Sequence, residues 1–240
     1  MNTIDQLIFG VLPYLAMALF FIETIRRYVT EKYSYTTMSS QFLENKQHFW
    51  GMMAFHYGII GTIAGHIIAF LLPKSVLWWN SYPIRLYILE ATAFIFGALS
   101  LFGVAAIIYR RISNPRVKVT TRFTDWIIYL FLTVVIVTGV YIAMFYGWGT
   151  SWFAASVTPY LWSLVKFQPQ IEYVASLPPV FKTHFFCVFI LIALFPFTKL
   201  VHILVAPNQY MLRKRQVVRW RWGRNPHLID TNSCELLVAG

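Results

Sequence analysis

The stretch GMMAFHYGIIGTIAGHIIAFLL, residues 51–72, decides the fold. It contains no Asp, Glu, Lys or Arg, and two histidines, His56 and His66, lie within it. The hydrocarbon core of a bilayer is about 30 Å thick, and roughly 20 apolar residues in an α-helix cross it. The stretch therefore predicts a transmembrane helix that carries two ionisable side chains.

Four further apolar segments outside this stretch are also long enough to span a bilayer. They lie at about residues 4–25, 84–109, 126–148 and 180–205. The whole chain is 58% hydrophobic and only 12% charged, against about 25% charged residues in a soluble domain. We therefore expect an all-α integral membrane protein, a bundle of five transmembrane helices. It forms one domain over residues 1–225, followed by a C-terminal tail, residues 226–240.

The basic residues predict how these spans are oriented. Of the 20 Lys and Arg residues, 16 fall on the side reached after the first, third and fifth spans. Cytoplasmic loops carry the excess of Lys and Arg, so the N-terminus is expected outside and the C-terminus in the cytoplasm. The basic residues that give the chain its net charge of +11 lie between apolar runs and not on a polar face. This pattern argues against a nucleic-acid partner. We expect a multi-pass protein of the cytoplasmic (inner) cell membrane, with the lipid bilayer as its surroundings.

Two other features limit the chemistry and the topology. The two cysteines, Cys187 and Cys234, form no Cys-x-x-Cys pattern, which excludes an iron–sulfur cluster held by this chain alone. The outer segment, residues 149–179, is rich in aromatic residues and broken by prolines. It is too irregular to span and is predicted to form an interfacial lid or a re-entrant segment.

Four of the six histidines lie inside predicted spans, where ionisable residues are rare and usually functional. They are His56 and His66 in the second span, and His184 and His202 in the fifth. In an α-helix these pairs are separated by roughly 15 Å and roughly 27 Å. Antiparallel packing of the two spans would bring His66 level with His184 near the outer surface, and His56 level with His202 near the inner surface.

This arrangement predicts two histidine–iron–histidine sites stacked across the membrane, as in b-type haem proteins. Tilt and a helix break at Pro196 would have to absorb the difference of roughly 12 Å between the two spacings. A single zinc ion is excluded, because two histidines about three turns apart on one helix cannot reach it. A proton relay through the histidines remains an alternative.

Several short motifs are distributed along most of the chain. They are Arg27-Tyr28 with Ser39-Ser40-Gln41, Phe55-His56-x-Gly58-Ile59 with Gly65-His66, Pro115-Arg116-Val117 with Thr120-Thr121 and Asp125, Leu194-Phe195-Pro196-Phe197 with His202-Ile203, and Pro207-x-x-Tyr210 with Arg213-Lys214 and Arg219. Each motif alone is weak, but together they are specific. With these motifs the chain resembles one family, the gamma subunit of membrane-bound respiratory nitrate reductase, a di-haem cytochrome b.

The resemblance implies two haems b: an inner one bound by His56 and His202, and an outer one bound by His66 and His184. It also implies that quinol is oxidised beside the outer haem, near Gly65 and His66. Electrons would then pass through the inner haem to an iron–sulfur (beta) subunit and on to a molybdenum catalytic (alpha) subunit that reduces nitrate. The chain would thus be the quinol-oxidising subunit of an enzyme complex.

The sequence departs from the family near the expected quinol site. Some members carry a lysine in the first turn of the third span that is thought to bind the quinone, and Tyr87 stands at that place here. We therefore take Gly65, His66, Arg85 and Tyr87 together as the candidate quinol site. Glu90, one turn further, is expected to be a packing or interface residue more than a proton acceptor.

Two basic residues in the matched motifs, Arg27 and Arg116, are candidates for contacts with haem propionates or with a partner subunit. Alternatives for the whole chain remain open. A related di-haem gamma-type subunit could serve another quinone-linked complex, of the nitrite-oxidising, sulfite or heterodisulfide type. A chain without haem could instead be a histidine-lined proton channel.

Overall fold

The computed structural model describes residues 3–30 and 46–204, with the side chains of residues 46–48 and 202 outside the description. All regular elements in these two ranges are helices. Five helical segments are long and apolar enough to cross a membrane. They are Thr3–Thr30, Phe49–Leu71, Pro83–Ser113, Phe123–Phe145 and Pro179–Phe197. The prediction of an all-α protein with five spans is confirmed, and the chain is a multi-pass membrane protein.

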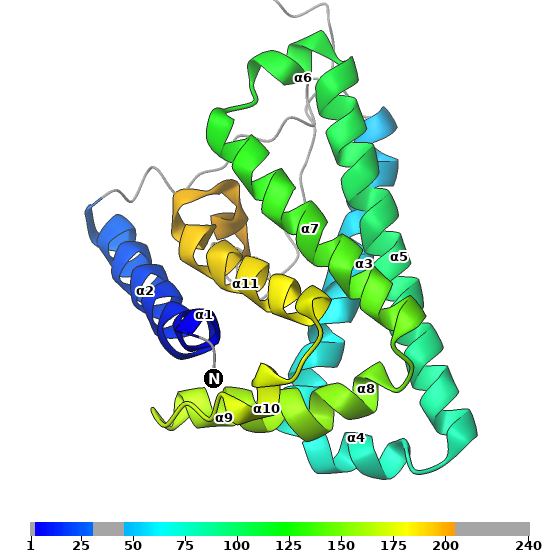
Figure 1. Cartoon of the computed structure of the whole chain (residues 1–240). Helices are drawn as coiled ribbons and strands as arrows, with labels where there is room; N and C mark the ends of the chain where they lie inside the picture. The colour runs from blue at the N-terminus through cyan, green and yellow to red at the C-terminus, as the bar shows by residue number, and fades with distance from the viewer. Residues whose placement is uncertain (1–2, 31–45, 205–240) are drawn as a thin grey trace, which may run out of the picture. The chain divides into compact units, whose positions relative to one another are not determined.

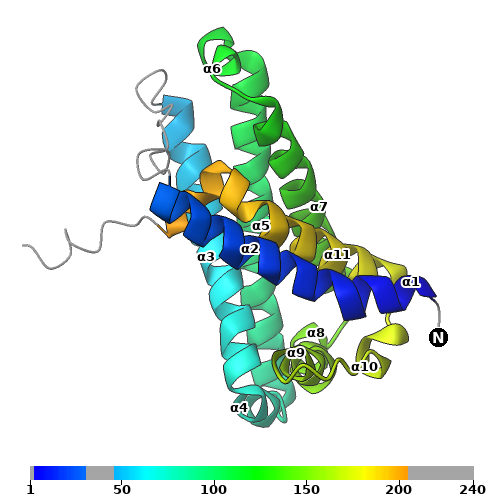
Figure 2. The ribbon, with the colours of Figure 1, turned by 90° about the vertical axis from the view of Figure 1, so that its left-hand side faces the viewer.

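The long helices follow one another in a row (Figures 1 and 2). The helix α3 (Lys46–Leu71) packs along α5 (Pro83–Ser113), and α5 packs on α7 (Phe123–Phe145). Next, α7 packs on α11 (Pro179–Leu194), and α11 packs on α2 (Leu12–Thr30). The two helices that carry the intramembrane histidines, α3 and α11, are therefore not close neighbours in this row.

Glycines allow α3 and α5 to approach each other closely. A Cβ atom at Gly58 would overlap the backbone of Ser100, and one at Gly103 would overlap the backbone of Phe55. Small residues at a helix interface let two backbones come together within a membrane, where no hydrophobic effect drives association. Gly58 and Gly61 thus serve helix packing, since a Cβ at Gly61 would meet the ring of Phe96.

Short helices lie across one end of the long ones (Figure 1). They are α4 (Pro73–Trp79), α8 (Gly149–Trp152), the π-helical turn η4 (Phe153–Val157), α9 (Thr158–Val165) and α10 (Glu172–Ala175). We call residues 149–165 the lid. As predicted, residues 149–178 form no membrane span, and the lid bonds to the C-terminal end of α3.

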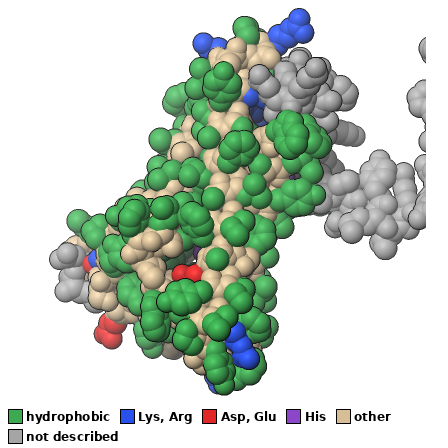
Figure 3. All heavy atoms as spheres, turned by 90° about the vertical axis from the view of Figure 1, so that its right-hand side faces the viewer, with side chains coloured by type: hydrophobic (Ala, Val, Ile, Leu, Met, Phe, Trp, Pro, Cys, Tyr) green, Lys and Arg blue, Asp and Glu red, His purple; other side chains and the backbone are tan. Residues whose placement is uncertain are grey.

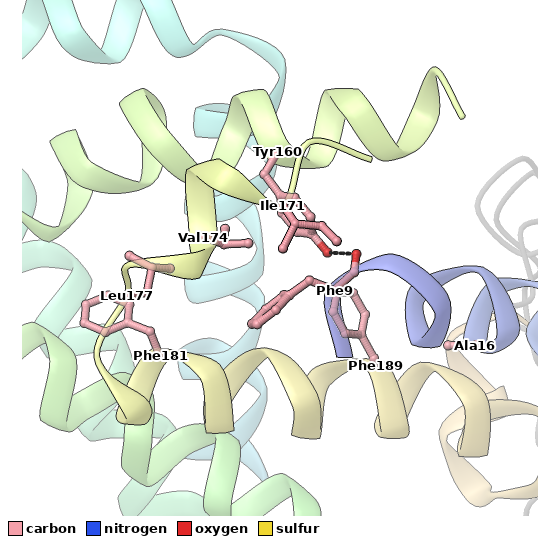
Figure 4. Close-up of a cluster of buried hydrophobic side chains, with 8 residues drawn as sticks. All are labelled: Phe9, Ala16, Tyr160, Ile171, Val174, Leu177, Phe181 and Phe189. Carbon is pink, nitrogen blue, oxygen red and sulfur yellow. Dashed lines mark hydrogen bonds between the residues drawn. The ribbon is translucent and has the colours of Figure 1, made fainter. Parts of the chain in front are cut away.

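A cluster of buried apolar side chains joins the lid and α10 to the first and last spans (Figure 4). Its members are Phe9, Ala16, Tyr160, Ile171, Val174, Leu177, Phe181 and Phe189. Phe9 lies in a π-helical turn, η1 (Leu7–Val11), which follows α1 (Thr3–Gln6). The Tyr160 hydroxyl donates to the Phe9 carbonyl at 2.7 Å, and burial raises the pKa of this phenol. Tyr160 therefore stays protonated and remains a donor.

Most of the remaining surface of the spans is apolar. Ile22, Ile60, Phe102 and Leu130, on four different spans, each expose more than half of their surface. Figure 3 shows one face of the long helices covered mainly by hydrophobic side chains, with Lys and Arg near its ends. Such a large exposed apolar surface is expected where lipid replaces water.

The fifth segment differs from the predicted single helix over residues 180–205. The α-helix α11 ends at Leu194, a 3-10 turn η5 (Phe195–Phe197) follows, and Thr198 is extended before a second 3-10 turn, η6 (Lys199–Ile203). Pro196 has no N–H to donate and its ring opposes a continuous helix, so the break falls at the predicted residue. The predicted boundary between the domain 1–225 and the tail 226–240 lies outside the described residues.

Candidate functional site

Two intramembrane histidines share one side-chain geometry on α3. The Nδ1 atom of His56 lies 2.8 Å from the Met52 carbonyl, and that of His66 lies 2.8 Å from the Thr62 carbonyl. A carbonyl oxygen can only accept, so Nδ1 carries the proton in both rings. This tautomer places the lone pair of each neutral imidazole on Nε2, which is the atom that would bind a metal.

His184 reaches the same tautomer through a neighbouring helix. Its Nδ1 lies 2.9 Å from the Thr138 hydroxyl on α7, and that hydroxyl itself donates to the Val134 carbonyl at 2.7 Å. The Thr138 oxygen therefore accepts the His184 Nδ1–H. Gly139 makes room for the ring, because a Cβ there would lie 3.3 Å from His184 Cε1. Histidines that bind metals usually donate their second N–H to an acceptor in this way.

The structure brings His66 and His184 to the end of the bundle that the lid covers. Their helices, α3 and α11, do not pack closely against each other. Gly65 adds open space beside His66, since a Cβ at this residue would meet no atom within 4 Å. An exposed imidazole next to such a space is suited to receive a flat ligand.

The inner pair is described only in part. His56 lies ten residues before His66 on α3, away from the lid end, and its side chain is half-buried. The backbone of His202 lies in η6, but its side chain lies outside the described residues. The pairing of His56 with His202 therefore stays a prediction.

The lid contacts the C-terminal turns of α3, around His66. The Phe153 ring lies edge-on to the His66 ring, with 5.0 Å between centroids. Thr158 donates to the Ala69 carbonyl at 3.2 Å, and Trp162 donates to the Phe70 carbonyl at 3.1 Å. These two bonds satisfy carbonyls that a helix C-terminus leaves unpaired. No pattern in the sequence marked Phe153, Thr158 or Trp162.

Glu90 on α5 fixes the start of the lid. Its carboxylate accepts the Thr150 backbone N–H at 2.8 Å and the Thr150 hydroxyl at 2.7 Å. Asn80 adds bonds to the hydroxyls of Thr150 at 3.0 Å and Ser151 at 2.9 Å. A carboxylate at a helix N-terminus is stabilised by the unpaired N–H groups there. Glu90 is thus the packing residue that the sequence suggested.

The predicted quinol residues are not all joined by contacts. The Arg85 guanidinium lies over the Tyr82 ring at 4.6 Å and over the Trp78 and Trp79 rings at 5.4 Å each. Tyr87 is 69% exposed. Neither residue hydrogen-bonds to or stacks on His66 in the described part of the chain, whereas Gly65 is its neighbour in sequence.

The two basic candidates take different positions. The Arg27 guanidinium donates to the Pro196 carbonyl, at the break in the fifth segment. Arg116 lies on the short helix α6 (Pro115–Val119), between α5 and α7. Its backbone N–H is bound by Asn114 at 3.1 Å and its side chain is exposed. An exposed arginine here is better placed for a partner surface than for a buried propionate.

A buried ionic cluster lies at the ends of α5 and α7 remote from the lid. Asp125, 5% exposed, accepts from Lys199 Nζ at 2.6 Å and lies 3.9 Å from Arg111 Nη1. It also accepts the Arg122 backbone N–H at 3.1 Å and so caps α7. The sequence marked Asp125 as part of a motif, but its pairing with Lys199 spans 74 residues and could not be predicted.

Comparison with known proteins identifies the family of the chain. The family model of the nitrate reductase gamma subunit matches residues 5–221. The chain is 29% identical to the nitrate reductase gamma chain of Bacillus subtilis over 90% of this chain and 98% of that protein. It is 31% identical to the respiratory nitrate reductase 2 gamma chain of Escherichia coli, over 89% and 96% respectively. It also matches 34% of the length of the nitrate reductase-like protein NarX of Mycobacterium tuberculosis, at 31% identity. The chain belongs to the nitrate reductase gamma subunit family.

Proposed function

We propose that this chain is the quinol-oxidising, di-haem b subunit of a nitrate reductase complex in the cytoplasmic membrane. The observation that carries the proposal is the shared tautomer of His56, His66 and His184. All three place a proton on Nδ1 and a lone pair on Nε2 inside an apolar bundle. A histidine-lined proton channel would require no such uniform arrangement.

The positions of the histidines support a proposal of two haem groups. His66 and His184 would hold the outer haem beside the space at Gly65, and His56 and His202 would hold the inner one. A bis-histidine haem supplies a one-electron carrier with no open coordination position. Thr138, through its hydroxyl, and the Met52 and Thr62 carbonyls keep the ligand rings in the tautomer that this role requires.

The quinol would bind at the lid end, against Gly65 and His66. Phe153 lies across the His66 ring and offers an aromatic surface to a quinol ring. Oxidation of one quinol releases two protons and two electrons. Because 16 of the 20 basic residues are predicted from the sequence to lie on the opposite side of the membrane, the lid end would face outwards, and the protons would be released there. Charge separation across the membrane is worth about 2.3 kcal/mol per charge per 100 mV.

The inner surface would bind the iron–sulfur subunit, which leads to the molybdenum subunit. The name gamma chain, carried by the relatives in Bacillus subtilis and Escherichia coli, supports membership of a multi-subunit complex. The exposed Arg116 on α6 is a candidate contact, because a guanidinium forms bidentate pairs with partner carboxylates.

Reduction of the b-type absorption by added quinol in membrane vesicles tests the proposal. Added quinol should reduce the b-type absorption of the wild type, and this reduction should be lost in the His66→Ala variant. His56→Ala should keep it, since the outer site remains. His48→Ala, a histidine outside the proposed ligands, serves as the control. A His66→Ala variant that oxidises quinol at the wild-type rate would contradict the proposal.

A further inference from the structure

The segment that follows α11, residues 195–203, lacks the hydrogen bonds that hold an α-helix. Pro196 cannot donate, Thr198 is extended, and the residues on either side form only 3-10 turns. We call it the break segment. Its position must therefore depend on contacts with other elements, and His202 lies within it.

Side chains from two other spans hold the break segment. Arg27 of α2 donates to the Pro196 carbonyl. Asp125 of α7 accepts from Lys199 at 2.6 Å. The Thr198 hydroxyl adds a local cap by accepting the Leu200 N–H at 3.2 Å. Among these contacts, only the one between Asp125 and Lys199 joins two formal charges.

Asp125 is a fixed point in the bundle. Its side chain is buried, it caps the first turn of α7, and Arg111 lies 3.9 Å away. Arg111 is itself held by the Thr121 hydroxyl at 2.9 Å and lies over the Tyr129 ring. A buried carboxylate bound on several sides has little freedom to move, so an ion pair to it fixes its partner.

From this geometry we infer that Asp125 is a positioning residue for His202, acting through Lys199. The inference rests on the proposed function, in which His202 binds the inner haem. Lys199 precedes His202 by three residues, which is one turn of a 3-10 helix, and Val201 between them is buried. The ion pair therefore sets where the His202 backbone lies.

Two substitutions remove the ion pair while keeping its surroundings. Asp125→Asn retains an oxygen that can accept the Arg122 N–H, so the cap of α7 is kept, but the charge is lost. Lys199→Gln removes the cation from a side chain that is 41% exposed, and the buried Asp125 carboxylate keeps Arg111, 3.9 Å away, as an ion-pair partner. Lys199→Arg keeps the pair. Glu23→Gln breaks another ion pair, with Arg26 at 2.8 Å, and is the control.

Carbon monoxide binding to the dithionite-reduced complex, with haem stoichiometry, is the measurement. A haem with two histidine ligands has no place for carbon monoxide, whereas a haem whose ligand has been displaced binds it. We expect one of the two haems in Asp125→Asn and Lys199→Gln to bind carbon monoxide. Wild type, Lys199→Arg and Glu23→Gln should bind none.

The possible failures can be told apart. If the wild-type chain holds no haem, the proposed function fails. If wild type holds two haems and Lys199→Gln also keeps two that bind no carbon monoxide, the positioning role of Asp125 is overturned while the proposed function stands. Equal effects on both haems would also overturn it, since the break segment carries only one proposed ligand. If the Asp125→Asn variant does not assemble, carbon monoxide binding to the Lys199→Gln variant tests the positioning role by itself.

Discussion

At the scale of single residues, the groups that accept hydrogen bonds from Nδ1 matter as much for the proposed haem sites as the histidines do. His56 and His66 bind carbonyls of their own helix, four residues earlier, whereas His184 depends on Thr138 of another helix. The sequence identified the histidines, because ionisable residues are conspicuous in apolar spans. It could not identify Thr138, because that contact joins residues 46 positions apart.

Thr138→Val tests the role of this acceptor. The substitution keeps the shape of the side chain but removes the Thr138 oxygen as a hydrogen-bond partner of the His184 Nδ1–H. A weaker Nδ1–H bond makes the imidazole a poorer donor to ferric iron. We therefore expect the reduction potential of one haem to rise while the other is unchanged, as measured by redox titration of the b-type absorption.

Thr133→Val is the matched control for this prediction. Thr133 lies on the same helix, and its buried hydroxyl has no hydrogen-bond partner. Its loss should leave both potentials at their wild-type values. Equal shifts in the two valine variants would show that the Thr138 bond has no special effect on His184.

At the scale of elements, glycines on α3 divide into two groups. Gly58 faces the backbone of α5, whereas Gly65 faces open space. The sequence alone cannot tell whether a glycine in this helix makes room for a ligand or for a neighbouring helix, because that depends on contacts between segments. The structure assigns Gly58 and Gly61 to helix packing.

Gly58→Ala should therefore destabilise the bundle. The added Cβ would overlap the Ser100 backbone, and overpacking of this kind costs about 1–3 kcal/mol. We expect a lower thermal unfolding temperature for the purified chain in detergent. Gly65→Ala, the same change on the same helix, should leave that temperature unchanged. A larger loss of stability for Gly65→Ala than for Gly58→Ala would contradict the assignment.

The lid is also an element whose attachment can be tested. Glu90→Gln replaces two charge-assisted bonds to Thr150, each worth about 1.5–3 kcal/mol, by weaker neutral ones. We expect faster amide hydrogen exchange over residues 149–157, with exchange in α7 unchanged. Glu172→Gln, an exposed glutamate in α10, is the control. Protection of the lid equal to wild type would show that Glu90 does not hold it.

At the scale of the whole molecule, hydropathy predicted the five spans, the aromatic and proline-broken composition of residues 149–179 predicted a lid or a re-entrant segment, and Pro196 predicted the place of the break. These features depend on local composition and on the chemistry of proline, which a sequence displays directly. The π-helical turns at Leu7–Val11 and Phe153–Val157, and the tie between Asp125 and Lys199, were not predicted. They arise from contacts between segments far apart in the chain.

In the proposed function, four histidines of one chain bind two haems across the membrane. The decisive test is pyridine haemochrome stoichiometry with a reduced-minus-oxidised spectrum, applied to each single His→Ala variant. Wild type, His48→Ala and His227→Ala should hold two b haems per chain, and variants of the four intramembrane histidines should each lose one. A chain without haem, or a haem content unaffected by the four substitutions, would contradict the claim and favour the proton channel.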